Sequence, residues 1–253
     1  MKKIWAIADL HLSFGTENKD MSLFGPNWIG WTEKIERHWK RHVSQDDLVL
    51  IPGDISWAKR LDEALVDLLW LDALPGTKVI LRGNHDYWWT SLQKLESHLP
   101  STLKILHNQA VNWNHVSIAG TRLWDSPAYH CLDLIDFEGD TYQKKLDEIE
   151  ETRKENQRLY HREIHRLELS LQHLDPKARL KIAMTHYPPL DPSLKRTPVT
   201  DLLETYGIDL CVFGHLHKLK KPLVYFGEKN GIRYYLTSSD VLNFCPLEIA
   251  EFY

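Results

Sequence analysis

The chain has 253 residues, of which 43% are hydrophobic and 26% charged, a composition typical of a globular protein with a real core. Its net charge of -4 at pH 7 provides no basic field, so nucleic acid is not indicated as a partner. No apolar run approaches the roughly 20 residues of a membrane span. The three cysteines lie far apart and form no disulfide framework, which favours the reducing cytoplasm as the location.

A short apolar run followed at once by a tight polar cluster recurs along the chain. Such runs, bounded by glycine or proline, are typical of buried strands, and helical patterns between them predict an α/β protein. We expect one domain over residues 1–253. The runs and clusters are, in chain order, Ile4–Ala8 before Asp9-Leu10-His11, Leu48–Ile51 before Pro52-Gly53-Asp54, Val79–Leu81 before Arg82-Gly83-Asn84-His85-Asp86, Leu180–Met184 before Thr185-His186-Tyr187, and Leu210–Phe213 before Gly214-His215-Leu216-His217.

Other segments complete the predicted elements. Helices are expected at Trp31–Val43 and Lys59–Asp72, where the second range places its leucines on one face. Asn230-Gly231 is a strong signal for a hairpin turn. Further strands are predicted at His115–Thr121, Leu223–Phe226, Ile232–Thr237 and Leu247–Phe252.

A dense run of charges from about residue 140 to 175 stands outside the pattern of strands. Apolar residues recur within it at helical spacing, which predicts a helix with one apolar stripe. The stripe consists of Tyr160, Ile164, Leu167, Leu171 and Leu174. We interpret the region as a helical insertion between two strands, whose charges form a solvated face or a lid over the site.

The polar clusters predict one site, because ligand sites in α/β sheets lie beyond the carboxyl ends of the strands. In an Asp-x-His or His-x-His pair on a strand, the first and third residues point to the same face. Glycines 53, 83 and 214 allow sharp turns and close approach of the backbone. We therefore expect side chains from all the clusters to converge on one rim of the sheet core.

Carboxylate and imidazole groups in these clusters are the ligands that divalent ions prefer. The candidate ligands are Asp9, His11, Asp54, Asn84, His186, His215 and His217. They are too many for one catalytic ion with an open position, but they suffice for two ions if one carboxylate bridges. Two ions about 3.5–4 Å apart can clamp the oxygens of a phosphoryl displacement and lower the pKa of a bridging water. The sequence therefore predicts a dinuclear hydrolase of phosphate esters, with manganese, iron or zinc as the metal.

The order of these motifs, from residue 9 to residue 217, resembles that of the calcineurin-like metallophosphoesterases. The resemblance implies two packed mixed β-sheets flanked by helices, the four-layer sandwich of the metallo-dependent phosphatases. It also implies that Asp9, His11 and His217 bind the first ion. Asp54 would bridge the ions, and the second ion would be bound by Asn84, His186 and His215.

The family resemblance also assigns a role to the residues after Asn84. His85 would donate a proton to the leaving oxygen or steady the phosphoryl charge, and Asp86 would orient His85. A turn cap is the alternative for Asp86. The flanking segments resemble a bacterial subgroup of unassigned substrate, and the motif set favours a phosphodiesterase. A phosphomonoesterase and a nuclease remain alternatives, whereas a non-catalytic metal-binding scaffold predicts a broken ligand set, which is not seen.

Residues beside the motifs suggest contacts with the substrate. Trp57 and Tyr87 are candidates for an aromatic wall, although aromatic side chains there could equally pack under the loops. Arg82 and Arg122 are candidates for phosphate contacts because the guanidinium group matches phosphate geometry, with surface ion pairs as the alternative.

Overall fold

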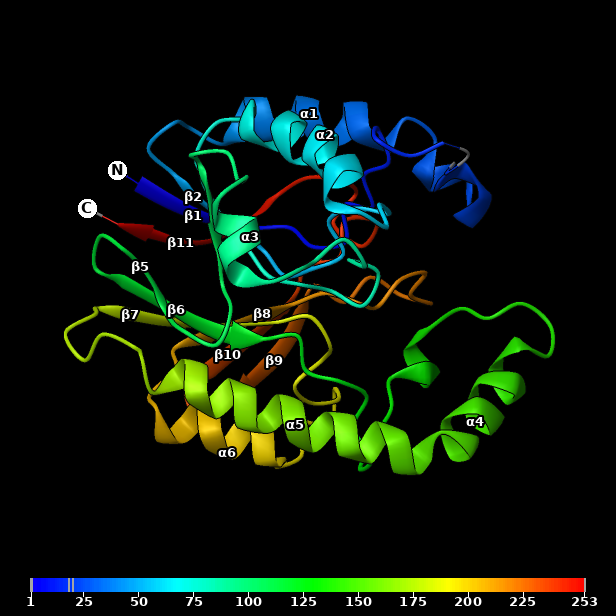
Figure 1. Cartoon of the computed structure of the whole chain (residues 1–253). Helices are drawn as coiled ribbons and strands as arrows, with labels where there is room; N and C mark the ends of the chain where they lie inside the picture. The colour runs from blue at the N-terminus through cyan, green and yellow to red at the C-terminus, as the bar shows by residue number, and fades with distance from the viewer. Residues whose placement is uncertain (1, 18, 20, 253) are drawn as a thin grey trace.

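Two β-sheets lie face to face with helices on their outer surfaces (Figure 1), as the family resemblance implies. This structure is a computed structural model that describes residues 2–17, 19 and 21–252. The first sheet has the strand order β11-β1-β2-β3-β4 and the second has the order β5-β6-β7-β8-β10-β9. Each sheet is mixed, with a parallel centre. The first sheet has an antiparallel strand at one edge and the second has one at both edges. The predicted fold class is therefore confirmed.

The first sheet is built from the two ends of the chain. Its parallel strands are β1 (Lys2–Ala6), β2 (Leu48–Ile51), β3 (Thr77–Ile80) and β4 (Leu103–Ile105), and β11 (Leu247–Phe252) pairs antiparallel to β1. The helices α1 (Trp31–His42), α2 (Leu61–Asp72) and α3 (Leu92–Glu96) pack on this half of the molecule, after the short 3-10 turns η1 (Met21–Phe24) and η2 (Pro26–Trp28).

The second sheet comes from the middle and the later part of the chain. Its strands are β5 (Val111–Trp113), β6 (Val116–Thr121), β7 (Leu180–Thr185), β8 (Leu210–Phe213), β9 (Tyr225–Lys229) and β10 (Ile232–Leu236). The predicted turn at Asn230-Gly231 joins β9 to β10, with positive φ angles of 50° and 83°. Because this two-residue turn pairs Lys229 with Ile232, β9 runs further than the predicted strand Leu223–Phe226.

Apolar side chains on both faces of the central strands explain why these runs are continuous rather than alternating. Ile4 and Ala6 of β1 face the second sheet and pack with residues such as Ile182 of β7. Trp5 points the other way, into the core beneath the helices of the first half. A strand that is buried on both faces has no polar side, so its sequence is a short apolar run.

The charged segment between β6 and β7 forms two helices, α4 (Thr141–Glu151) and α5 (Arg153–Leu171), rather than one. The apolar stripe of α5 is buried against the second sheet at Tyr160, Leu167 and Leu171. Ser170 accepts a hydrogen bond from the Gly120 backbone N–H at 2.9 Å and so ties α5 to β6. Helix α4 buries none of its residues, which explains why no apolar stripe predicted it. The remaining elements, η3 (Leu132–Leu134) and α6 (Pro198–Thr205), also lie in this half.

In the described part of the chain, no helix is both long and apolar enough to cross a bilayer.

Candidate metal centre

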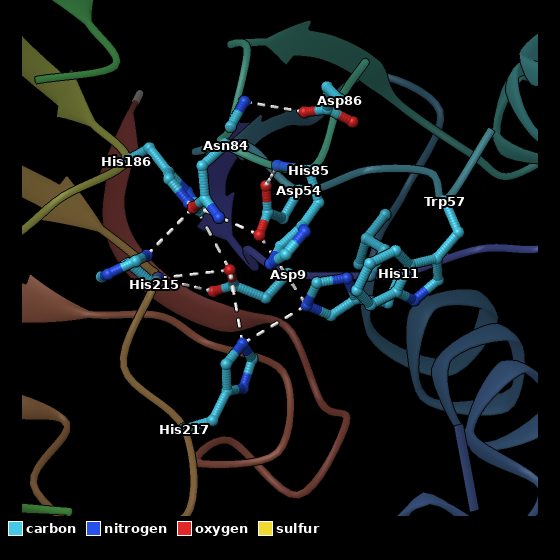
Figure 2. A network of polar contacts seen from close by, with 12 residues as sticks. Asp9, His11, Asp54, Trp57, Asn84, His85, Asp86, His186, His215 and His217 are labelled. Atoms are coloured by element: carbon cyan, nitrogen blue, oxygen red, sulfur yellow. Dashed lines mark hydrogen bonds and ion pairs between the residues drawn. The ribbon is translucent and has the colours of Figure 1, made fainter. Parts of the chain in front are cut away.

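Polar side chains from both sheets meet at the carboxyl ends of the parallel strands (Figure 2). The structure brings all seven predicted ligand residues together. Asn84 Oδ1 lies 2.6 Å from His186 Nε2 and 3.1 Å from His215 Nδ1. His11 Nε2 lies 3.3 Å from His217 Nε2. Residues that are far apart in the sequence thus form one continuous polar cluster between the sheets.

Two overlapping groups within this cluster could each hold an ion. Asp9, His11 and His217 form the first group, and Asp9, Asp54 and His186 form the second, with the ligand atoms of each group within 4.8 Å of one another. One oxygen of Asp54, Oδ2, lies 3.9 Å from His11 Nε2 and 3.5 Å from His186 Nε2. Asp9 Oδ1 lies 3.9 Å from His186 Nδ1 and 3.6 Å from His217 Nε2. Both carboxylates therefore lie between imidazoles of the two groups.

The backbone at this site is in a conformation that most residues avoid. Asp9, His11, Asp54 and His215 have positive φ angles of 57°, 46°, 52° and 73°. Hydrogen bonds hold the turns, for example from the Asp9 N–H to the Gly53 carbonyl at 3.0 Å. Strained non-glycine residues of this kind concentrate at functional sites, where the surrounding structure over-determines them.

Close packing around the carboxylates explains why two of the three glycines noted in the sequence cannot carry a side chain. A Cβ atom at Gly83 would overlap the Asp54 carboxylate, and one at Gly214 would overlap the Asp9 carboxylate. Any larger residue at these positions would push a carboxylate out of the cluster. The glycines therefore make room for the site as well as for the turns.

The electrostatics of the cluster fit divalent cations. Burial, followed by repulsion from Asp9, raises the pKa of Asp54 to about 8. Burial is also the main reason that the pKa values of His11 and His215 lie well below the usual range. His11 and His215 thus offer neutral imidazoles with free lone pairs beside carboxylates that repel one another, and a cation would relieve this repulsion.

Asp240 contacts the cluster but is absent from the residues predicted from the sequence. Its Oδ1 lies 2.8 Å from His217 Nδ1, and its Oδ2 accepts a hydrogen bond from the Lys218 N–H at 3.0 Å. Burial opposes a charge on His217, but Asp240 and Asp9 raise its pKa well above the usual range. The segment Ser238-Ser239-Asp240 directly follows the predicted strand Ile232–Thr237, so the same pattern of apolar run and polar cluster could have revealed it.

His85 lies beside the cluster with one ring nitrogen unused. Its Nδ1 is buried and has no hydrogen-bond partner among the described residues. The ring centroids of His85 and Trp57 are 4.4 Å apart. Burial, followed by the nearby His186, lowers the pKa of His85 to about 4, so the ring is neutral in the free site. An anionic group beside this ring would favour its protonated form.

The structure corrects the expected orientation of His85 by Asp86. The carboxylate of Asp86 is fully buried and accepts hydrogen bonds from backbone and indole donors instead. These donors are the N–H groups of Ile55 (2.9 Å), Ser56 (3.1 Å) and Gly83 (2.7 Å) and the Trp88 indole (3.0 Å). Asp86 therefore connects the two loops that carry Asp54 and Asn84. This role resembles the alternative of a turn cap, because the carboxylate accepts from backbone N–H groups of both loops.

A pocket of about 400 Å³ opens directly over the cluster. One wall is apolar and comes from Met21, Phe24, Trp28 and the predicted Trp57. The opposite wall is formed by residues 135–138 and by Thr141 at the start of α4. The insertion thus contributes a wall to the pocket, while its movement as a lid stays a prediction.

Three predicted substrate contacts lie outside this pocket. Tyr87 is 59% exposed and is next to His85, with ring centroids 6.3 Å apart, but its side chain lines a separate surface hollow. Arg82 and Arg122 line another cavity, together with Glu163 of α5. Because neither arginine lines the pocket above the cluster, the structure does not support their expected contact with a phosphate group there.

Comparisons with known proteins support the same fold and chemistry. A family model described as calcineurin-like phosphoesterase matches residues 2–219. The structure of phosphopantetheinyl hydrolase (PptH) from Mycobacterium tuberculosis has a TM-score of 0.57 at 17% identity, covering 94% of this chain and 89% of that chain, which shows a shared fold.

Two further structures are similar at TM-scores below 0.5. Purple acid phosphatase PPD1 from yellow lupin has a TM-score of 0.48 at 15% identity, covering 100% of this chain and 45% of that chain. Calcineurin-like phosphoesterase YfkN from Bacillus subtilis has a TM-score of 0.45 at 15% identity, covering 94% and 81%. A search of curated proteins gives no match.

Proposed function

The chain belongs to the calcineurin-like phosphoesterase family and is a metal-dependent phosphoester hydrolase, and from this premise we propose that it hydrolyses phosphodiesters with two divalent ions in one site. The observation that supports two ions is the pair of overlapping ligand groups, which share Asp9. The ions, when bound, supply Lewis-acid stabilisation of the phosphoryl group and activation of a water molecule. The oxygen and nitrogen donors suit manganese, iron or zinc.

The seven converging residues divide between the two ions. Asp9, His11 and His217 would hold the first ion. Asn84, His186 and His215 would hold the second, which agrees with the short contacts from Asn84 Oδ1 to both rings. Asp54 would bridge, since its Oδ2 lies between the His11 and His186 rings.

His85 would act on the phosphoryl group from the side of the pocket. It lines the pocket above the cluster, and its Nδ1 is free to hydrogen-bond. A negatively charged phosphate ester beside the ring would raise its low pKa and let it donate a proton to the leaving oxygen. Trp57, whose ring is tilted by 49° against that of His85, would help to keep the His85 ring in place.

The shape of the pocket favours a diester over a monoester. A monoester places one organic group on phosphorus, whereas a diester needs space for two. The pocket provides an apolar wall on the side of η1 and η2 and a mixed wall on the side of α4, where Asp136 and Lys218 bring opposite charges. Among the described residues that line the pocket, Lys218 is the only lysine or arginine, so a nuclease is a weaker fit. The three cysteines are free, in keeping with the cytoplasm as the proposed location.

Hydrolysis of two model esters tests this function. The purified protein is assayed with Mn²⁺ on bis-p-nitrophenyl phosphate and on p-nitrophenyl phosphate, with a sample treated with a chelator as control. We expect faster turnover of the diester, and loss of activity in the chelated sample that added Mn²⁺ restores. Turnover of the monoester alone would show that the protein is a phosphomonoesterase rather than a phosphodiesterase. No turnover of either ester by metal-loaded protein would contradict the proposal.

Asp240→Ala should lower the affinity for metal about 10–100-fold. Asp240 would hold the proton on Nδ1 of His217 and so leave Nε2, which lies 3.6 Å from Asp9 Oδ1, available to the first ion. Titration calorimetry with Mn²⁺ on chelator-treated protein measures the change. Asp175→Ala is the matched control, because Asp175 is half-buried in the loop between α5 and β7, at the end of β7 remote from the site. Equal affinities in Asp240→Ala and in the unaltered protein would rule out this positioning role.

A further inference from the structure

A second cavity, here called the arginine cavity, lies between the ends of β3 and β6 and helix α5. Its volume is about 110 Å³, well above the roughly 30 Å³ that one water molecule occupies. Its polar lining includes Arg82, Trp89, His107, Arg122, Glu163 and Arg166. None of these residues lines the pocket above the candidate metal centre. The arginine cavity is therefore a separate feature of the molecule.

Positive charge is in excess in the arginine cavity. Glu163 is the only carboxylate among its lining residues, against the guanidinium groups of Arg82, Arg122 and Arg166. Glu163 is 1% exposed and its oxygens are already used: Oε2 accepts from the Thr121 hydroxyl at 2.8 Å, and Oε1 accepts from Arg166 at 2.9 Å. Arg122 forms only a long ion pair with Glu163, at 3.9 Å, which is beyond hydrogen-bond distance. Among the described residues, Arg82 has no carboxylate partner, so one buried carboxylate faces three guanidinium groups.

Two buried donors in the arginine cavity also lack partners. The Nε of Arg82 and the indole Nε1 of Trp89 are buried and have no hydrogen-bond acceptor in the described part of the chain. Trp89 is 7% exposed, so its N–H is well shielded from bulk water. A buried N–H without an acceptor is costly and uncommon. Both residues line the arginine cavity, although Trp89 also borders the surface hollow beside Tyr87. One multivalent acceptor in the arginine cavity could satisfy both donors.

We propose that the arginine cavity binds a small tetrahedral oxyanion of the phosphate type, independently of the metal centre. Such an ion carries several acceptor oxygens and negative charge, and guanidinium groups match its geometry. It would accept from Arg82 Nε and Trp89 Nε1 and balance the charge of Arg122 and Arg166.

The bound anion would lie behind the turns that carry two of the proposed metal ligands. The carbonyl of Arg122 accepts hydrogen bonds from the N–H groups of His186 at 3.1 Å and Tyr187 at 2.9 Å. Arg82 stands two residues before Asn84. The arginine cavity is thus placed to sense the phosphate that phosphoester hydrolysis releases, or to hold a second phosphate group of a substrate.

Titration calorimetry with inorganic phosphate on the metal-loaded protein tests the proposal. Arg166→Gln is compared with Arg162→Gln, a matched control. Both arginines donate to Glu163 Oε1 and are similarly exposed, at 39% and 46%, but only Arg166 lines the cavity. We expect Arg162→Gln to bind phosphate like the unaltered protein, whereas Arg166→Gln should lose one phosphate per chain or bind it about tenfold more weakly.

Trp89→Phe removes the indole N–H while keeping an aromatic ring, and should weaken the same phosphate site. If both Trp89→Phe and Arg166→Gln bind phosphate like the unaltered protein, the cavity holds only water and the proposal is overturned. The KM for bis-p-nitrophenyl phosphate separates the two sources of the anion. An unchanged KM in Arg166→Gln with weakened phosphate binding supports a free ion, and a raised KM supports a phosphate group of the substrate.

Discussion

Asp54→Asn should lower kcat/KM for the phosphodiester by at least about 10³-fold and reduce the number of ions that the protein retains. The carboxylate lies between the two ligand groups, so the substitution weakens the charge that would hold both ions. The fold should survive, because burial and the charge of Asp9 already oppose ionisation of Asp54. An amide of the same shape relieves that repulsion.

Metal analysis and kinetics of the same preparations provide the measurement for Asp54→Asn. Asp46→Asn is the matched control, since Asp46 is exposed on the turn before β2, at the end of the strand remote from the site. Thermal unfolding of both variants shows that the fold is retained. A folded Asp54→Asn protein with full metal content and ordinary activity would remove Asp54 from the site.

His85→Asn should lower kcat by about 10²–10⁴-fold while the protein keeps its full metal content. His85 lines the pocket but is not a member of either ligand group. Its substitution should therefore affect the chemical step rather than the binding of ions. Metal analysis and steady-state kinetics together distinguish this variant from Asp54→Asn. The exposed His98 on the turn after α3 offers a matched control, His98→Asn.

The leaving group separates the two roles considered for His85. If the ring donates a proton, the loss in His85→Asn should be much larger for a diester with an alkyl alcohol as leaving group than for a p-nitrophenyl ester, because p-nitrophenolate leaves without protonation. If the ring only steadies the phosphoryl charge, both substrates should lose activity equally. A variant that has lost its ions along with its activity would place His85 in the metal site instead.

The sequence predicts the central strands well because two signals coincide at each of them. Strand β2 and strand β8 are observed at the predicted residues Leu48–Ile51 and Leu210–Phe213, where a short apolar run ends at glycine or proline. A strand buried on both faces cannot take polar residues, so its composition alone marks it. The same logic places the candidate ligands at one rim, and the structure brings them within contact of one another.

The parts that the sequence does not predict depend on long-range contacts. Strands β4 and β5 have three residues each, too few to show a period. Asp86 and Arg82 stand beside Asn84 in the chain, which suggested roles in the same pocket. The Asp86 side chain instead connects two loops, and Arg82 lines the arginine cavity. The local sequence does not indicate in which direction either side chain points.

The position of the candidate metal centre at the seam between the sheets has a thermodynamic consequence. Asp9 and Asp54 follow strands of the first sheet, and His186 and His215 follow strands of the second. The inner faces of the sheets pack through apolar side chains, and backbone hydrogen bonds such as that from the Ala8 N–H to the Thr237 carbonyl also join the two halves. An ion bound to both sides acts as a cross-link that exists only when the sheets are docked. By mass action, the metal concentration then sets how often the two halves separate, so folding stability and metal supply become linked quantities.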